Sequence, residues 1–171
     1  MAIVSLTVHD TVTYVSDRDP CKVKTQVPVD PADPSKGYKE SIEIKDGATK
    51  FFLKPIDVFL KGHIYDNATV LQAKQGTDEV GFRTRVNQTN IEVVRHGLIG
   101  FENFLDKRGN AIPFKTVKAN VNGREYDVAS DEVLTALGLN LIQELAAEIK
   151  RISEVDQEEE KNSDEVFSQF A

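Results

Sequence analysis

The chain has 171 residues, of which 40% are hydrophobic and 29% are charged, and its formal net charge is -7. This composition is too apolar for a wholly disordered chain, and the length allows one domain with a core of its own. The single cysteine excludes an internal disulfide, and no apolar run reaches the roughly 18 residues that cross a membrane. The first residues also lack a signal-peptide pattern, so we expect a cytoplasmic protein without a membrane partner.

The acidic charge is concentrated near the C-terminus. Seven acidic residues and one lysine lie between Glu154 and Glu165, so this segment carries most of the net charge. The rest of the chain is close to neutral, which argues against a basic surface for nucleic acid. We therefore predict a single domain over residues 1–153 and an acidic tail over residues 154–171.

The first part of the chain has the alternation of apolar and polar residues that is typical of strands. This pattern predicts strands over residues 3–15 and 22–27. A segment with three prolines follows at residues 28–37 and predicts an exposed loop.

A second pair of strands is predicted after this loop. Ile42 and Ile44 alternate with polar residues before an Asp46–Gly47 turn, and a further short strand ends at Pro55. An Asp-Gly pair between two alternating runs favours a hairpin, so we expect these two strands to pair with each other.

The period changes towards 3.6 after this strand. Ile56, Phe59 and Leu60 have the spacing of one helical face, which predicts a helix over residues 55–66. Residues 67–86 contain two glycines and show mixed periodicity, so we predict mostly loop there.

A short helix is predicted to begin at Thr89 or Asn90 and to end at Gly97. It leads into the stretch GFENFLDKRGNAIPF, residues 100–114, which we interpret as a strand, a tight turn and a return strand. Gly109 is the turn residue that can adopt a positive φ. The apolar face of this hairpin would consist of Phe101, Phe104, Ile112 and Phe114.

The last part of the domain is predicted to be a hairpin followed by an amphipathic helix. Asn122–Gly123 is a strong hairpin turn signal, and Ser130 can cap the helix, which Gly138 interrupts. The buried face of the helix is predicted to be Leu141, Leu145, Ile149 and Ile152. The outward side chains are predicted to be Glu144, Glu148 and Lys150.

The acidic tail ends in a small apolar helix face. Its acidic run includes Glu158, Glu159 and Glu160, and the apolar positions that follow are Val166, Phe167 and Phe170. This pattern is typical of a segment that binds a groove on a partner protein as a helix. In the alternative interpretation, the tail is a solubilising end whose phenylalanines pack back on the domain.

The sequence contains no recognisable catalytic or cofactor motif. The three histidines lie outside metal-binding spacing, and the patterns of a serine nucleophile or a phosphate-binding loop do not occur. The Glu144 and Glu148 pair sits at helical spacing, for which solvation is the common explanation. We therefore predict a protein that is not an enzyme and that needs no cofactor or metal.

Three segments belong together as a set, namely TKFFLKPIDVFLKGHIYD, VVRHGLIGFENFLDKRGNAIPF and LIQELAAEIKRISEVDQEEEKNS. They resemble small morphogenesis proteins of tailed bacteriophages, a group that includes tail assembly chaperone-like members. They span residues 49–163, and Phe101 stands where the family often has Trp. The first 48 residues have no counterpart in this resemblance. With the strand-rich beginning and the final helix, we expect an α+β domain.

The resemblance implies a role in assembly through protein–protein binding. A tail assembly chaperone coats the tape-measure protein and recruits tail-tube subunits in the cytoplasm of the host bacterium. One alternative is a permanent virion component, such as a neck, connector or capsid-associated protein, whose strands join neighbouring subunits in an oligomer. A further alternative is a phage-encoded inhibitor that binds a host protein through its acidic end.

Overall fold

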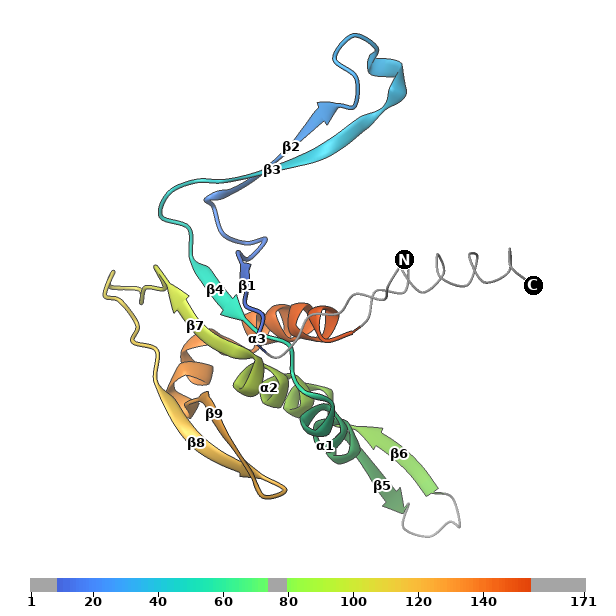
Figure 1. Cartoon of the computed structure of the whole chain (residues 1–171), viewed down its shortest axis with the longest axis vertical. Coiled ribbons are helices and arrows are strands. Elements are labelled where there is room, and N and C mark those ends of the chain that lie inside the picture. The colour runs from blue at the N-terminus through green and yellow to red at the C-terminus, as the bar shows by residue number, and fades with distance from the viewer. Residues whose placement is uncertain (1–8, 74–79, 155–171) are drawn as a thin grey trace, which may run out of the picture.

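The computed structural model describes residues 9–73 and 80–154, and Figure 1 shows how the elements are arranged. In chain order these are β1 (Val12–Tyr14), β2 (Lys22–Pro28), a short 3-10 helix (Pro34–Lys36), β3 (Tyr38–Ile44), β4 (Lys50–Leu53), α1 (Val58–Ala68), β5 (Thr69–Ala73), β6 (Val80–Thr84), α2 (Val86–Gly97), β7 (Leu98–Glu102), β8 (Thr116–Val121), β9 (Arg124–Ala129) and α3 (Asp131–Ile152). All the described strands precede the long helix α3, which confirms the predicted α+β class.

The core lies where one small sheet meets the helices. Strand β4 is the middle strand of this sheet and pairs antiparallel with β1 on one side and β7 on the other. Buried residues of β4, α1, α2 and α3 form one continuous apolar cluster. The largest fully buried side chains of the described chain are Phe51, Leu53, Val93, Val94, Val128, Val133, Leu145 and Ile149. Burial of these side chains is the main favourable term in folding.

Three further pairs of strands form separate two-stranded sheets, namely β2–β3, β5–β6 and β8–β9. The β8–β9 pair confirms the hairpin predicted at Asn122–Gly123, and both turn residues have a positive φ, 51° and 80°. In Figure 1 the three hairpins extend away from the central helices in different directions.

The predicted hairpin between residues 42–44 and Pro55 is wrong. Strand β3 pairs with β2 along its whole length, whereas β4 joins the central sheet. The Asp46–Gly47 turn, in which Gly47 has a φ of 88°, instead leads the chain from β3 back to the central sheet. The proline-rich loop is therefore the connection of a hairpin, because its ends meet where Val29 N–H donates to Gly37 O at 2.9 Å.

Two other strand predictions need correction. The segment predicted as loop over residues 67–86 contains β5 and β6, which pair antiparallel from Thr69–Thr84 to Ala73–Val80. The glycines at positions 76 and 81 had obscured the strand pattern. Of the strand predicted over residues 3–15, Val12–Tyr14 is a strand, while residues 1–8 lie outside the described part of the chain.

The predicted start of α1 is three residues too early. Asp57 accepts a hydrogen bond from Leu60 N–H at 2.8 Å, so a cap forms at Asp57 rather than at Pro55. Leu60 and Ile64 are buried as the periodicity indicates, but Phe59 is 61% exposed and lies under Arg124.

The predicted start of α2 is also wrong, whereas its predicted end at Gly97 is confirmed. The helix begins at Val86, and both Thr89 and Asn90 are buried inside it. Thr89 Oγ1 donates to Arg85 O at 2.8 Å, and Asn90 Oδ1 accepts from Lys150 Nζ at 2.7 Å. These polar residues satisfy groups in the interior, which local sequence does not reveal.

The stretch from residue 100 to residue 114 is a strand and a turn without a regular return strand. After β7, a single bridge joins Leu105 to Ala111. Asp106 closes the turn by accepting from the N–H groups of Arg108 and Asn110, and Gly109 has the expected positive φ, 83°. Because Pro113 has no N–H to donate, a regular ladder is not available to the return segment.

Helix α3 follows the predicted pattern at its start and along most of its buried face, except that Leu141 is half-buried and the neighbouring Ile142 is buried. Ser130 Oγ accepts from Val133 N–H, and Gly138 breaks the helix with a φ of 73° and a ψ of 161°. The prediction that Glu144 and Lys150 point outward is wrong. Glu144 Oε1 accepts from Tyr14 O–H at 2.9 Å and from Asp17 N–H at 3.0 Å, and Lys150 reaches Asn90.

Candidate functional site

A two-stranded arm formed by residues 22–44 is the most prominent surface feature of the described chain. It consists of β2, β3 and their connecting loop, and it projects from the top of the molecule in Figure 1. The ladder runs from Lys22–Ile44 at the base to Pro28–Tyr38 near the tip. No third described strand pairs with either β2 or β3, so both edges of the arm are unpaired.

The base of the arm is fastened to the body by polar contacts. Lys22 Nζ donates to Val15 O at 2.8 Å and lies 2.6 Å from Asp17 Oδ1. The Lys22 ammonium, with Lys24 nearby, holds the pKa of the Asp17 carboxyl below its ordinary value. Asp19 Oδ2 accepts from Thr49 N–H at 2.8 Å. This hydrogen bond links the segment before β2 to the segment after β3, which are the two connections between the arm and the body. The base is therefore held at a defined position.

The tip of the arm is also a defined structure. Asp33 caps the 3-10 helix by accepting from Ser35 N–H, and Lys36 Nζ lies 2.7 Å from Asp30 Oδ2. This ion pair is exposed at the surface, and the Lys36 hydrogen bond is the main reason that the pKa of Asp30 is lowered. The loop thus holds β2 and β3 in register at the tip.

One face of the arm exposes large apolar side chains. Tyr38, Ile42 and Ile44 are 61%, 53% and 49% exposed, and their even spacing along β3 places them on the same face. An isolated two-stranded hairpin is only marginally stable in water, and natural proteins usually cover or charge exposed strand edges. The arm therefore has the chemistry of a surface that binds another protein.

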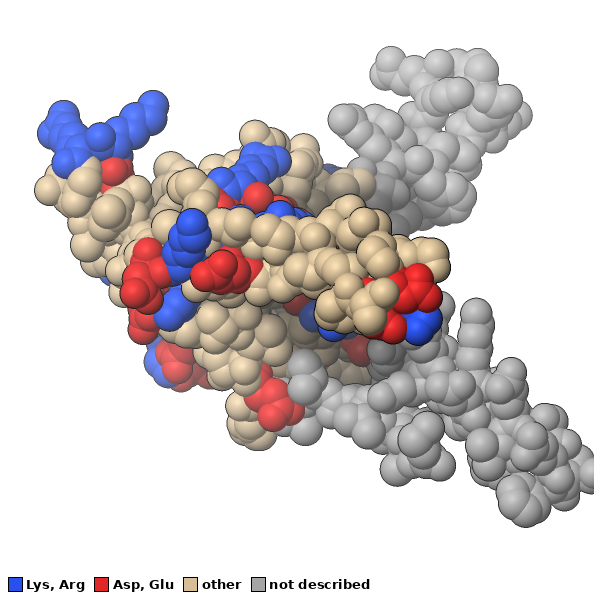
Figure 2. Space-filling view, turned by 90° about the horizontal axis from the view of Figure 1, so that it is seen from above, with Lys and Arg blue, Asp and Glu red and all other residues tan. Residues whose placement is uncertain are grey.

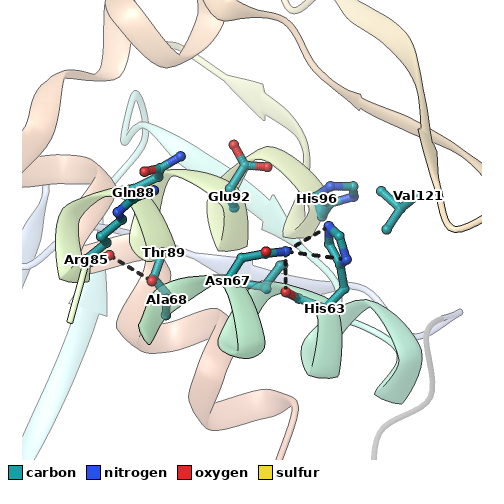
Figure 3. Close-up of a pocket in the computed structure, with 10 residues that line it drawn as sticks. His63, Asn67, Ala68, Arg85, Gln88, Thr89, Glu92, His96 and Val121 are labelled. Atoms are coloured by element: carbon teal, nitrogen blue, oxygen red, sulfur yellow. Dashed lines mark hydrogen bonds between the residues drawn. The ribbon is translucent and has the colours of Figure 1, made fainter. Parts of the chain in front are cut away.

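A second candidate site is a pocket of about 270 Å³ between α1, α2 and the β8–β9 hairpin. Figure 3 shows His63 and Asn67 of α1 beside His96 of α2, with Val121 at one end, and Glu92 of α2 also lines the pocket. Asn67 Nδ2 donates to His63 O at 2.9 Å and lies 3.2 Å from the His63 ring nitrogen Nε2. The lining is therefore polar on both helices.

His96 is the buried ionisable group of this pocket. It is 4% exposed, and its Nδ1 atom has no hydrogen-bond partner in the described structure. Burial, together with the positive charge of Arg95, lowers the pKa of His96 to about 4. The ring contacts the edge of Tyr126, whose O–H donates to Asp57. The imidazole is thus neutral at pH 7, which suits packing and hydrogen bonding.

The pocket histidines do not form a metal-binding set. Among the described residues, no group of three or more His, Cys, Asp or Glu side chains could hold a metal ion. Glu92, the carboxylate of this pocket, lies 3.3 Å from the Arg95 guanidinium. We therefore assign no catalytic chemistry to the pocket.

An open hollow of about 460 Å³ lies beside the break in α3. Its apolar lining includes Ile91, Leu134, Leu139 and Ile142. Arg95 and Asp131 also line it and form an ion pair with a distance of 2.6 Å. This hollow could receive an apolar side chain of a partner, with a charged pair beside it.

The residues predicted from the sequence to carry structure come together in the described chain. Phe101 contacts the rings of Phe104 and Phe114 edge to face, with centroids 5.1 Å and 5.3 Å away, and Phe51 of β4 packs on the same group. Leu145 and Ile149 are fully buried. The predicted partner-binding residues Glu158, Glu159, Glu160, Val166, Phe167 and Phe170 lie outside the described residues.

The surface charge does not indicate whether a binding partner would be acidic or basic. In the view from above, acidic and basic side chains of the described residues are interspersed (Figure 2). Tyr38, Ile42 and Ile44, by contrast, give one face of the arm an apolar character. The alternation of Ile42 and Ile44 was a signal of a strand, but the same pattern is found when the apolar face is buried.

Comparisons with known proteins do not assign the chain to a family. No family model matches it, and no curated protein or solved structure gives a significant match. In the described residues no helix is both long enough and apolar enough to cross a membrane.

Proposed function

We propose that the chain is a non-enzymatic assembly protein of a tailed bacteriophage, and that it acts by binding other phage proteins. The observation that carries this proposal is the arm. It offers two unpaired strand edges and an exposed apolar face, while its base is fixed to the body. Strand addition at such an edge supplies affinity through main-chain hydrogen bonds and needs no catalytic group.

The arm favours a permanent virion component over the other roles that the resemblance implies. Rigidly held strand edges suit a lasting contact between neighbouring subunits, because ordering a hairpin in advance lowers the entropy cost of association. In this role the chain is made in the host cytoplasm and becomes a stoichiometric part of the particle, for example at the neck or the connector.

The second candidate is a tail assembly chaperone. The hollow beside α3 favours it, because Leu134, Leu139 and Ile142 offer an apolar surface to a segment of an unassembled partner. The acidic tail, with Phe167 and Phe170, would then recruit tail-tube subunits while the tape-measure protein is covered. The chaperone would leave before the particle is complete.

Quantitative mass spectrometry of purified phage particles, with the infected-cell lysate beside them, tests the proposal. A fixed number of copies per particle is the result expected for a virion component. Abundance in the lysate, absence from particles and co-purification with the tape-measure protein would instead support the chaperone. Absence from particles together with co-purification of a host protein alone would overturn the assembly function and favour a host-directed inhibitor.

A further inference from the structure

We propose that the arm binds a second copy of this chain, edge to edge, with β3 of one copy adding to β2 of the next. This inference rests on the proposed function and names the partner of the arm. The paired strands would extend the two-stranded arm into a longer antiparallel sheet.

The backbone of the arm shows which groups are available at its edges. Val29 N–H donates to Gly37 O at the tip, and Lys45 N–H donates to Cys21 O at the base. Hydrogen-bonded pairs alternate with non-hydrogen-bonded pairs along an antiparallel ladder. Between these two points, the main-chain N–H and C=O groups of the odd-numbered residues of β2 therefore point towards β3. The main-chain groups of Lys24 and Gln26 therefore point away from the hairpin.

The same alternation applies to β3. In the observed register Lys24 lies opposite Ile42 and Gln26 lies opposite Glu40, so the main-chain groups of Ile42 and Glu40 also point outward. A second copy can place its β2 beside this β3 in the same register that joins the two strands within the arm. The outward N–H and C=O groups of the two strands then face each other and can form hydrogen bonds. The arm is therefore complementary to another arm in both strand direction and hydrogen bonding.

The charges on the two edges favour this head-to-tail arrangement. Strand β2 carries Lys22 and Lys24 and no acidic residue, whereas β3 carries Glu40 and Glu43 with one lysine. Within the arm, Lys24 Nζ lies 3.5 Å from Glu40 Oε1, which shows that this diagonal pair can form in the observed register. Pairing β2 with β2, or β3 with β3, would bring like charges together instead.

Exposed apolar side chains give the contact a second driving force. Tyr38, Ile42 and Ile44 share one face of β3, so a neighbouring β2 would cover part of this face with the stem of its Lys24. Head-to-tail contacts use a different surface on each copy, and they produce rings or open chains rather than a closed dimer. Self-association should therefore continue beyond two copies as the concentration rises.

The test uses sedimentation of the full chain over a range of concentrations, with two charge-reversal variants. Lys24→Glu places a carboxylate beside Glu40 of the neighbouring copy, and Glu40→Lys places an ammonium beside its Lys24, so each variant alone should lose self-association. In an equal mixture, β2 of the Lys24→Glu chain is complementary to β3 of the Glu40→Lys chain, and the reverse contact is complementary too. The mixture should therefore associate again.

Lys107→Glu is the control, because it reverses one charge in the exposed turn after β7 and leaves the arm unchanged. It should associate like the wild type. Each variant should keep the wild-type thermal midpoint, since the arm lies outside the core. A second variant, Ile42→Pro, removes an outward N–H without removing a hydrogen bond inside the arm, and it should also lose association.

Several results would overturn the inference. These are a wild-type chain that remains monomeric at every concentration, an assembly that stops at a dimer, and a mixture that stays as dissociated as its components. This measurement is independent of particle composition. A chain that is found in particles but does not self-associate would refute the arm contact alone, whereas a self-associating chain that is absent from particles would refute the virion role alone.

Discussion

At the scale of single residues, the burial of His96 makes the stability of the fold depend on pH. The pKa of His96 is about 4 in the folded chain, compared with an ordinary value of 6.5. Between these two pH values the unfolded chain binds a proton that the folded chain does not bind. Acidification from pH 6.5 towards pH 4 therefore removes stability, with a limiting slope of about 1.4 kcal/mol per pH unit from this group.

Urea unfolding of the wild type and of His96→Phe between pH 7 and pH 4.5 measures this contribution. Phenylalanine keeps a ring against Tyr126 and does not titrate. The free energy of unfolding of His96→Phe should therefore fall less steeply on acidification than that of the wild type. His63→Gln is the matched control, because it changes the other histidine of the pocket and leaves His96 in place. Equal slopes for the wild type and His96→Phe would contradict the assignment of this pH dependence to His96.

Gly97 and Gly62 are both helical glycines, but their surroundings differ. A Cβ atom at Gly97 would lie 2.6 Å from Ile149 Cγ2, whereas nothing lies within 4 Å of a Cβ at Gly62. We expect Gly97→Ala to cost about 1–3 kcal/mol through overpacking of α2 against α3. Gly62→Ala should instead stabilise the chain by about 0.5–1 kcal/mol.

Chemical denaturation of the two glycine variants gives opposite signs if this packing is correct. A gain in stability for both variants would show that α3 moves to accept the methyl group at little cost. The close approach to Ile149 gives Gly97, the last residue of α2, a packing role in addition to its predicted place at the end of the helix.

At the scale of elements, helix α3 provides the largest share of the buried face. Leu145 is fully buried, so replacing it with alanine should lower the free energy of unfolding by about 2–5 kcal/mol. Leu139 lies on the same helix and is 45% exposed, and its replacement should cost far less. Similar losses in the two variants, measured by urea unfolding, would refute the packing of α3.

The elements that were predicted correctly are those that local chemistry determines. Asn122–Gly123 forms its hairpin and Ser130 caps α3, because turn and cap preferences act within a few residues. The pairing of β3 with β2 could not be predicted in this way. Both neighbours of β3 have strand character, and the choice between them depends on contacts far along the chain.

The same distinction between local preferences and distant contacts explains which features of the candidate site could be predicted from the sequence. The strands of the arm were predicted, but alternation alone does not distinguish an exposed face from a buried one, so Ile42 and Ile44 gave no sign of a partner. The helical spacing of Glu144 predicts a solvated side chain, but in the fold Tyr14, which is distant in sequence, donates a hydrogen bond to it. His96 likewise gained its burial from three elements that are separate in sequence.

At the scale of the whole molecule, the chain separates its apolar surface into a core and an exposed arm. The core joins the central sheet to α1, α2 and α3, while the arm shares no strand pairing with that sheet in the described residues. Changes in the arm should therefore alter association with little effect on unfolding. The assembly role and the stability of the fold can be measured independently for this reason.

The acidic tail is the other segment for which we expect binding and folding to separate. Replacing both Phe167 and Phe170 with alanine should abolish capture of the tape-measure protein from infected-cell lysate if the tail binds a groove as the chaperone role requires. Because these residues would then contribute nothing to the core, the thermal midpoint should stay within about 1 °C of the wild type, since a change of 1 kcal/mol shifts it by about 2–8 °C. Ser168→Ala, a polar position between the two phenylalanines, should leave both capture and midpoint unchanged. A large fall in the midpoint of the double variant would instead place the two rings in the core, and the tail would then be part of the domain that residues 1–153 were predicted to form alone.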